Sequence, residues 1–162
     1  MKQVIVADSS PLISFARAGK LHIVQLVYAK IVIPPAVYEE IVVNGKGKPG
    51  AEEIRIASWI KIEKPMNKSK VEIIEAKFGP GESEAIVLAE EIEAVLLADE
   101  VVVIKEARKR GLQVTSTHLI LEEAKRRNLI KSAKVELDGL IASGFRTTPG
   151  LIRETLRRVG EY

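Results

Sequence analysis

Short apolar runs that alternate with helical segments are the feature that most constrains the fold of this chain of 162 residues. Runs dominated by Ile, Val, Leu and Ala are predicted to be buried strands at residues 3–7, 31–33, 59–62, 94–98 and 112–115. Helical segments separate these runs, and no internal repeat or linker-like composition interrupts them. Alternating strands and helices favour a parallel sheet covered by helices on both faces. We therefore expect a three-layer α/β/α fold with a central parallel sheet, in one domain spanning residues 1–162.

Prolines and glycines indicate where several helices begin and end. A helix is predicted to begin at Pro11, with Ser10 as its N-cap, and to stop at Gly19. The Gly-Pro-Gly break at 79–81 precedes a helix that is predicted to begin at Glu82. In parallel α/β sheets, ligands bind beyond the carboxyl ends of the strands. The residues that directly follow each strand are therefore the first candidates for a functional site.

Composition excludes several classes of protein. The chain has no cysteine, which rules out a disulfide framework, a Cys-based zinc site and a cysteine nucleophile. No basic-then-apolar leader opens the chain, and no apolar run approaches the ~18–20 residues that span a bilayer. We therefore expect a soluble, cytoplasmic protein without membrane association. Lys, Glu, Arg and Ile are plentiful while Gln and Asn are scarce, a balance common in heat-adapted proteins.

The charge is unevenly distributed along the chain. Residues 1–100 contain 12 Lys and Arg against 15 Asp and Glu, whereas residues 101–162 contain 13 against 7. An acidic first part and a basic second part fit a protein that gathers metal on one surface and phosphates on another. Solvated helix faces would produce the same imbalance, so charge alone leaves both interpretations open.

Several acidic residues are predicted to meet at the carboxyl edge of the sheet. Asp8 directly follows the first strand and Asp99 follows the strand at 94–98, while further acids lie in nearby helices, at Glu39, Glu40, Glu82 and Glu84. Carboxylates ~5 Å apart repel by about 3 kcal/mol per pair at an effective dielectric near 20, so a persistent cluster indicates a bound cation. Mg²⁺ prefers such oxygen ligands. Each acid alone also has a plainer interpretation, as a loop cap, a complement to a helix dipole or exposed surface.

The order and spacing of these acids resemble those of the PIN-domain family, specifically its prokaryotic branch related to the toxin half of type II toxin–antitoxin pairs. The resemblance covers nearly the whole chain and rests on residues 4–13, 33–41, 79–89, 96–100 and the tail at 139–146. Two positions depart from the family's usual pattern. Ala98-Asp99-Glu100 stands where Thr-Arg-Asp or Thr-Asp-Asp is common, and Ser116 precedes Thr117 where many members have glycine.

The resemblance implies a metal-dependent endoribonuclease that hydrolyses RNA phosphodiesters with a metal-activated water, using Mg²⁺ or Mn²⁺. The implied catalytic residues are Asp8, Glu40, Glu84 and Asp99, of which Asp8, Glu84 and Asp99 are the implied metal ligands. Glu40 would bind metal or orient the attacking water. Supporting roles beside the ligands fall to Ser9, Glu82 and Glu100, although Ser9 is equally well interpreted as a helix cap.

RNA is the implied partner, held through its phosphates by cationic side chains. The clusters that fit this role are Arg108, Lys109, Arg110, Lys125, Arg126 and Arg127, each of which also fits a solvated helix face. The resemblance further implies an antitoxin protein and a homodimer as candidate partners. His22 and His118 are isolated and lack the spacing of metal ligands, so we interpret them as packing or surface residues.

The principal alternative is a catalytically weak or inactive module of the same fold that binds RNA or a protein partner. Two other doubly wound enzyme classes fit less well. A haloacid-dehalogenase-type phosphatase requires a second aspartate two residues after the first, where this chain has Ser10. A response-regulator receiver requires an acidic pair near its start, and residues 1–10 contain one acid.

Overall fold

A computed structural model describes residues 3–162 and contains a parallel sheet of strand order β3-β2-β1-β4-β5. The strands are β1 (Ile5–Ala7), β2 (Ile31–Ile33), β3 (Ile60–Ile62), β4 (Val95–Leu97) and β5 (Val114–Thr115). Val6 pairs with Val32 on one side and with Leu96 on the other, and Leu96 pairs with Val114. Each strand lies within or at the predicted apolar run, so the expected parallel sheet is confirmed.

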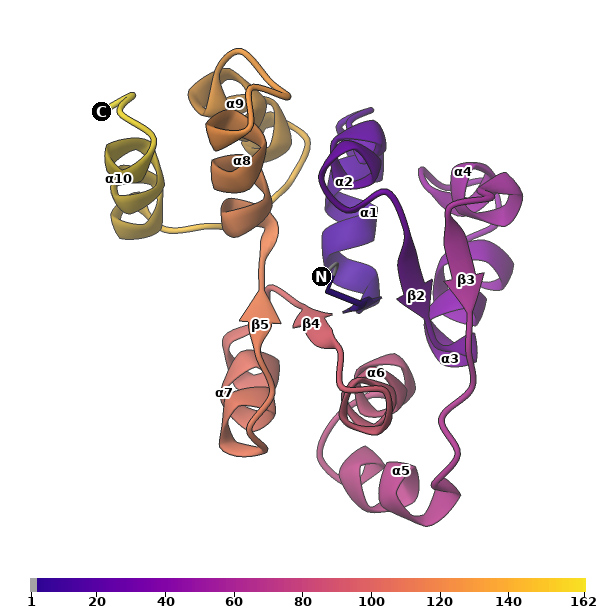
Figure 1. The fold of residues 1–162 in the computed structure, drawn as a ribbon. Coiled ribbons are helices and arrows are strands. Elements are labelled where there is room, and N and C mark those ends of the chain that lie inside the picture. Colours follow the sequence, from indigo (N-terminus) through magenta and orange to yellow (C-terminus); the bar gives the residue numbers. More distant parts are fainter. Residues whose placement is uncertain (1–2) are drawn as a thin grey trace.

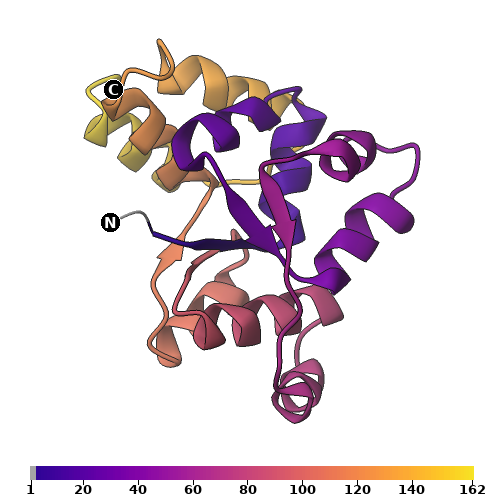
Figure 2. The same ribbon diagram turned by 45° about the vertical axis from the view of Figure 1, so that its right-hand side comes forward.

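Helices connect the strands and cover both faces of the sheet (Figure 1). They are α1 (Ser9–Arg17), α2 (Leu21–Tyr28), α3 (Pro35–Tyr38), α4 (Ala51–Ile56), α5 (Lys68–Glu75), α6 (Pro80–Glu91), α7 (Val101–Lys109), α8 (Thr117–Arg126), α9 (Ala133–Ala142) and α10 (Pro149–Arg158), with a π-helical turn η1 (Glu39–Val43) after α3. Figures 1 and 2 show α5, α6 and α7 on one face, and α1, α2, α8 and α9 on the other. This arrangement is the expected three-layer α/β/α fold.

Two hydrophobic cores fill the space between the layers, because successive strand residues point to opposite faces. In β1, Ile5 and Ala7 pack with α1, α2, α8 and α9, whereas Val6 packs with α5, α6 and α7. The same alternation places Val95 and Leu97 of β4 in the first core and Leu96 in the second. Burial on both faces explains why these strands appear in the sequence as continuous apolar runs.

Two helices begin earlier than predicted. Helix α1 begins at Ser9, and its N-cap is Asp8, whose Oδ1 accepts a hydrogen bond of 2.8 Å from the Ser9 N–H. The predicted N-cap at Ser10 is therefore wrong, because the aspartate that ends the strand already caps the helix. Helix α6 begins at Pro80 rather than Glu82, since Glu82 reaches back to accept a hydrogen bond from the Gly79 N–H at 2.9 Å.

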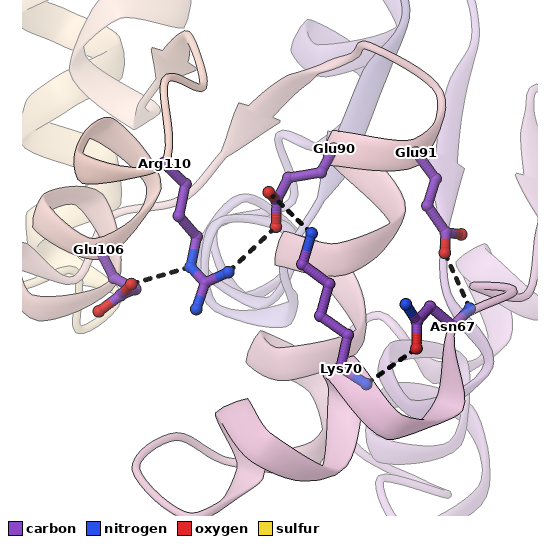
Figure 3. A network of polar contacts seen from close by, with 6 residues as sticks. All are labelled: Asn67, Lys70, Glu90, Glu91, Glu106 and Arg110. Atoms are coloured by element: carbon purple, nitrogen blue, oxygen red, sulfur yellow. Dashed lines mark hydrogen bonds and ion pairs between the residues drawn. The ribbon is translucent and has the colours of Figure 1, made fainter.

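A polar network joins the start of α5 to the C-terminal ends of α6 and α7 (Figure 3). These ends lie away from the carboxyl edge of the sheet. Arg110 donates to Glu106 at 2.8 Å and to Glu90 at 3.3 Å, and Glu90 also pairs with Lys70 at 3.2 Å. Glu91 accepts two backbone N–H groups at the start of α5. These contacts fix the C-terminal end of α6, so that its first turn lies at the carboxyl edge of the sheet.

Helix α10 packs on the outside of α8 (Figure 1). A buried histidine, His118, attaches it. His118 lies between the Thr147 and Thr155 hydroxyls, with 2.7 Å from each ring nitrogen to an oxygen, and its ring lies against Phe145. The interpretation of His118 as a packing residue therefore agrees with its surroundings. Across residues 3–162, no helix has both the length and the apolar character needed to cross a membrane.

Candidate active site

A concave pocket of about 180 Å³ lies where β1, β2 and β4 end. Its lining comes from four separate segments of the chain and consists of Asp8, Ser9, Ser10, Glu40, Gly79, Gly81, Glu82 and Glu100. Four of these residues are acids. The parallel sheet brings them together because the segments that follow its strands, and the helix that enters β4, all meet at the carboxyl edge.

Asp8 is the most buried acid of the pocket, with 2% of its surface exposed. The pKa of Asp8 is raised from 3.8 to about 7, chiefly by burial and also by the negative charges of Glu82, Glu40 and Glu100, while the hydrogen bond from the Ser9 N–H opposes the shift. The carboxyl group is therefore close to half-protonated at neutral pH. A cation in the pocket would remove this penalty by offsetting the surrounding negative charge.

Glu82, from the first turn of α6, and Glu100, from the segment after β4, also line the pocket. Burial raises the pKa of Glu100, as do a hydrogen bond with Glu82 and the charges of Glu82 and Glu40. A cation bound beside these carboxylates would lower the pKa of Glu100 again.

Glu40 enters the pocket from the π-helical turn η1, a type of irregularity that occurs frequently at functional sites. Gly81, in the first turn of α6, lies beside Glu40. A Cβ atom at Gly81 would make ordinary contacts, 3.4 Å from Val37 and 3.8 Å from Glu40 Oε1. The sequence indicated Ser10 only as a helix cap and Gly81 only as part of the Gly-Pro-Gly break, and neither as a residue of the site.

Glu84 and Asp99 do not line this pocket. Glu84 Oε1 accepts the Ala36 N–H at 3.0 Å and so caps the start of α3. Asp99 accepts the Thr117 N–H at 2.8 Å and the Thr117 hydroxyl at 2.6 Å. Burial raises the pKa of Asp99, and both bonds from Thr117 lower it. The expected ligand set of Asp8, Glu84 and Asp99 is thus not assembled at one point.

Backbone geometry explains this division of the acids. Two residues apart on a helix, Glu82 and Glu84 are separated by about 200° around the axis and cannot face the same cavity. Asp99 and Glu100 are consecutive in an extended segment, so their side chains point to opposite sides. In each pair one acid faces the pocket and the other binds backbone of a neighbouring element.

The donor chemistry of the pocket fits a hard divalent cation, because all four charged side chains offer carboxylate oxygens. Among residues 3–162, no three acidic or histidine side chains are already arranged to hold a metal ion together. Mg²⁺ typically uses one or two carboxylates and keeps several waters, so a hydrated ion fits this open arrangement. Asp8, Glu40, Glu82 and Glu100 are the residues that would hold it.

The predicted cationic clusters lie away from this pocket. Helices α7 and α8 begin at the carboxyl edge and run back, so that their basic C-terminal ends lie at the amino edge of the sheet. Arg110 is engaged with Glu106 and Glu90, and Lys125 Nζ donates to the Lys131 carbonyl at 2.7 Å. Lys109 is exposed, whereas three arginines, Arg108, Arg126 and Arg127, line a separate cavity.

Comparisons with known proteins give a similar solved structure and a matching family model. A solved structure of a PilT N-terminus domain protein from the hyperthermophilic archaeon Sulfolobus solfataricus P2 superimposes with a TM-score of 0.47 and 16% identity, covering 90% of this chain and 98% of that one. No curated protein sequence matches the chain. The family model DUF3368, described as a PIN domain, matches residues 4–161. The chain therefore belongs to the PIN-domain family.

Proposed function

We propose that this protein is a divalent-metal-dependent endoribonuclease whose active site is the pocket formed by Asp8, Glu40, Glu82 and Glu100. PIN domains are generally metal-dependent nucleases that typically use divalent metals. One observation carries the proposal for this chain. Four carboxyl groups converge in a concave site and, together with burial, raise the pKa of Asp8 to about 7. Such a shift is costly to stability and is typical of functional sites.

The chain's own residues would bind the cation, position the substrate and manage a proton. Mg²⁺ or Mn²⁺, when bound, supplies an activated water and neutralises charge on the scissile phosphate. Asp8 Oδ1 accepts a hydrogen bond from the Ser9 N–H, which holds the carboxyl group at the start of α1. Without a cation the pKa of Asp8 is about 7, so the carboxyl group would give up its proton when the cation binds.

The proposal also includes RNA as the substrate, a toxin role and the candidate partners. They rest on the resemblance of the motifs and on the excess of cations after residue 100. An antitoxin would silence the enzyme by placing a cationic side chain among the four acids of the pocket. The proposal includes a cytoplasmic setting, a single domain and a homodimer as the assembly to test.

A second candidate function is a PIN-fold module that binds RNA or a protein without efficient cleavage. The observation that favours it is the open arrangement of the acids, since residues 3–162 contain no ready-made group of three metal ligands. Under this alternative, the carboxylates would remain too far apart to bind a metal ion at physiological concentrations.

Paired variants separate these functions, because two of the pocket acids, Glu82 and Glu100, have an acidic neighbour outside the pocket. We expect Glu82→Gln and Glu100→Gln to reduce metal-dependent RNA cleavage by about a hundredfold or more. Glu84→Gln and Asp99→Asn serve as matched controls, since an amide oxygen can still accept the backbone bond that each carboxylate makes.

The outcome of this experiment decides among three assignments. Loss of cleavage only in the Glu82 and Glu100 variants supports the pocket. Loss only in the Glu84 and Asp99 variants would return the metal site to the residues expected from sequence. If the parent protein neither cleaves RNA nor gains thermal stability on titration with Mg²⁺ or Mn²⁺, the non-cleaving module is the better description.

A further inference from the structure

A second cavity, of about 860 Å³, lies at the amino edge of the sheet, opposite the carboxylate pocket. The first residues of β1, β4 and β5 form its floor, and the C-terminal ends of α2, α7 and α8 form its walls. Figure 1 shows α7 and α8 on opposite sides of β5. Its volume lies within the range of about 300–1,000 Å³ that is typical of small-molecule sites.

The floor of the cavity is apolar. Ile5, Val95 and Val114 come from three adjacent parallel strands, and Leu119 extends the surface from α8. Leu26 of α2 also lines the cavity and is 47% exposed. Ile5 and Val95 are already buried in the sheet, so the apolar surface that a flat group such as a nucleobase could cover comes from Val114, Leu119 and Leu26.

Neutral polar groups lie beside this floor and offer both donors and acceptors. The Tyr28 hydroxyl donates to the Thr115 hydroxyl at 3.2 Å, and Gln3 Nε2 donates to Gln113 Oε1 at 3.2 Å. Within residues 3–162, the second half of this amide pair, Gln113 Nε2 and Gln3 Oε1, makes no hydrogen bond to protein. A side-chain amide that presents one donor and one acceptor matches the edge of a nucleobase.

The cationic side chains on the walls differ in whether they already bind a partner within the protein. Arg127 donates to the Val27 carbonyl at 2.7 Å and so braces α2 against α8, while Arg126 pairs with Glu123. Glu123 therefore offers no unpaired negative charge. Arg108, on the α7 side, has no acidic partner among residues 3–162. Its guanidinium is available for bidentate binding of a phosphate.

We propose that this cavity binds a nucleotide, with the base on the apolar floor beside the Gln3–Gln113 pair and the phosphate on Arg108. The nucleotide could be free or be the end of an RNA chain, since both present the same chemistry. An acidic peptide fits less well, because it would leave the apolar floor and the neutral amides without partners. The proposal does not depend on cleavage at the carboxylate pocket, from which the cavity is separated by the length of the sheet.

Binding can be measured without any contribution from the carboxylate pocket, by calorimetric titration in EDTA. The ligands are AMP, a 5′-phosphorylated trinucleotide, adenosine, inorganic phosphate and polyglutamate. The variant is Arg108→Glu, and the matched control is Lys105→Glu, which makes the same charge change three residues earlier on α7 on an exposed side chain that does not line the cavity. Both sites are exposed, so both variants should fold.

We expect AMP or the trinucleotide to bind the parent protein, and Arg108→Glu to weaken that binding about tenfold or more while Lys105→Glu leaves it within about twofold. Binding of AMP identifies a free nucleotide as sufficient, whereas binding of the trinucleotide alone identifies an RNA end. The proposal is overturned if neither ligand binds at roughly millimolar concentration. Equal effects of the two variants, or tighter binding of polyglutamate than of either nucleotide, would overturn it as well.

Discussion

Replacing Asp8 with asparagine should stabilise the metal-free protein at neutral and alkaline pH. The carboxyl group of Asp8 is buried among three other acids, which raises its pKa to about 7, so its ionised form is disfavoured in the folded state. Asparagine has no charge to bury and nearly the same shape. It can also keep the N-cap of α1, because its side-chain oxygen can accept the Ser9 N–H that Asp8 Oδ1 accepts.

The magnitude follows from the difference between the two pKa values of Asp8. The ordinary value is 3.8 and the folded value is about 7. At about 1.4 kcal/mol per pH unit, ionised Asp8 costs the folded state about 4 kcal/mol. Rearrangement of nearby side chains and loosely bound counterions relieve part of this cost, so we expect a gain of about 2 to 4 kcal/mol in the free energy of unfolding.

The pH dependence has a definite sign. Below about pH 4, Asp8 is protonated in both the folded and the unfolded state, and the parent and the variant should be equally stable. Between about pH 4 and pH 7 the unfolded chain releases this proton while the folded protein retains it. The parent therefore loses stability relative to Asp8→Asn as pH rises through this window, and the difference is constant at higher pH.

Urea denaturation in EDTA at pH 4, 6 and 8 measures this difference directly. Asp138→Asn is the control, since Asp138 lies on the exposed side of α9 and pairs only with Lys134, and we expect it to change stability by less than about 0.5 kcal/mol. If Asp8→Asn is no more stable than the parent at pH 8, the electrostatic account of the pocket is refuted. Saturating Mg²⁺ should stabilise the parent and not the variant, which reverses their order.

Three other substitutions test the structural supports of the site. Thr117→Val should destabilise the protein by about 1 to 3 kcal/mol in urea denaturation, because it removes a 2.6 Å hydrogen bond from the buried Asp99 carboxylate. Arg110→Ala should cost about 1 kcal/mol, since this partly exposed side chain joins α6 and α7 through two glutamates, and unchanged thermal unfolding would count against that link. His118→Phe should speed proteolysis after α9 while leaving the sheet protected in hydrogen exchange, because Thr147 and Thr155 lose their partner.

Much of the fold could be predicted from the sequence, because strands buried on both faces leave an unmistakable pattern. Residues 5–7, 31–33 and 95–97 are apolar at every position, and each strand is buried throughout. The order of strands in the sheet was not specified by any local feature. It depends on which apolar surfaces pack best, a property of distant residues rather than of neighbours along the chain.

Helix starts were less predictable, since more than one residue could serve as the cap. Asp8, Ser9 and Ser10 are all good N-caps, and the structure selects Asp8 because the chain leaves β1 in an extended conformation at that residue. This choice also has a chemical consequence. The residue that caps α1 is the most buried acid of the pocket, so its carboxylate is held in place by the backbone of the helix that it begins.

The sequence could not show which acids face the pocket, although all four acids of the pocket were among the predicted site residues. Within Glu82 and Glu84, or Asp99 and Glu100, both residues can bind metal, and only the direction of each side chain separates them. Those directions depend on where α6 begins and on the partner that Thr117 offers to Asp99. A change of one residue in either feature would exchange the roles within the pair.

The two edges of the sheet divide the charge of the molecule, and this division constrains how RNA could be bound. Because α7 and α8 carry their cations at their C-terminal ends, beside the amino ends of β4 and β5, the arginines near residues 108 and 126 lie away from the acids. A phosphate at Arg108 would lie about 12 Å farther along α7 than Glu100, from a rise of 1.5 Å per residue. An RNA that reached both sites would have to pass around the β5 edge of the sheet. The cations therefore cannot offset the charge of the carboxylate pocket directly, and the metal ion of the proposed function would supply that positive charge instead.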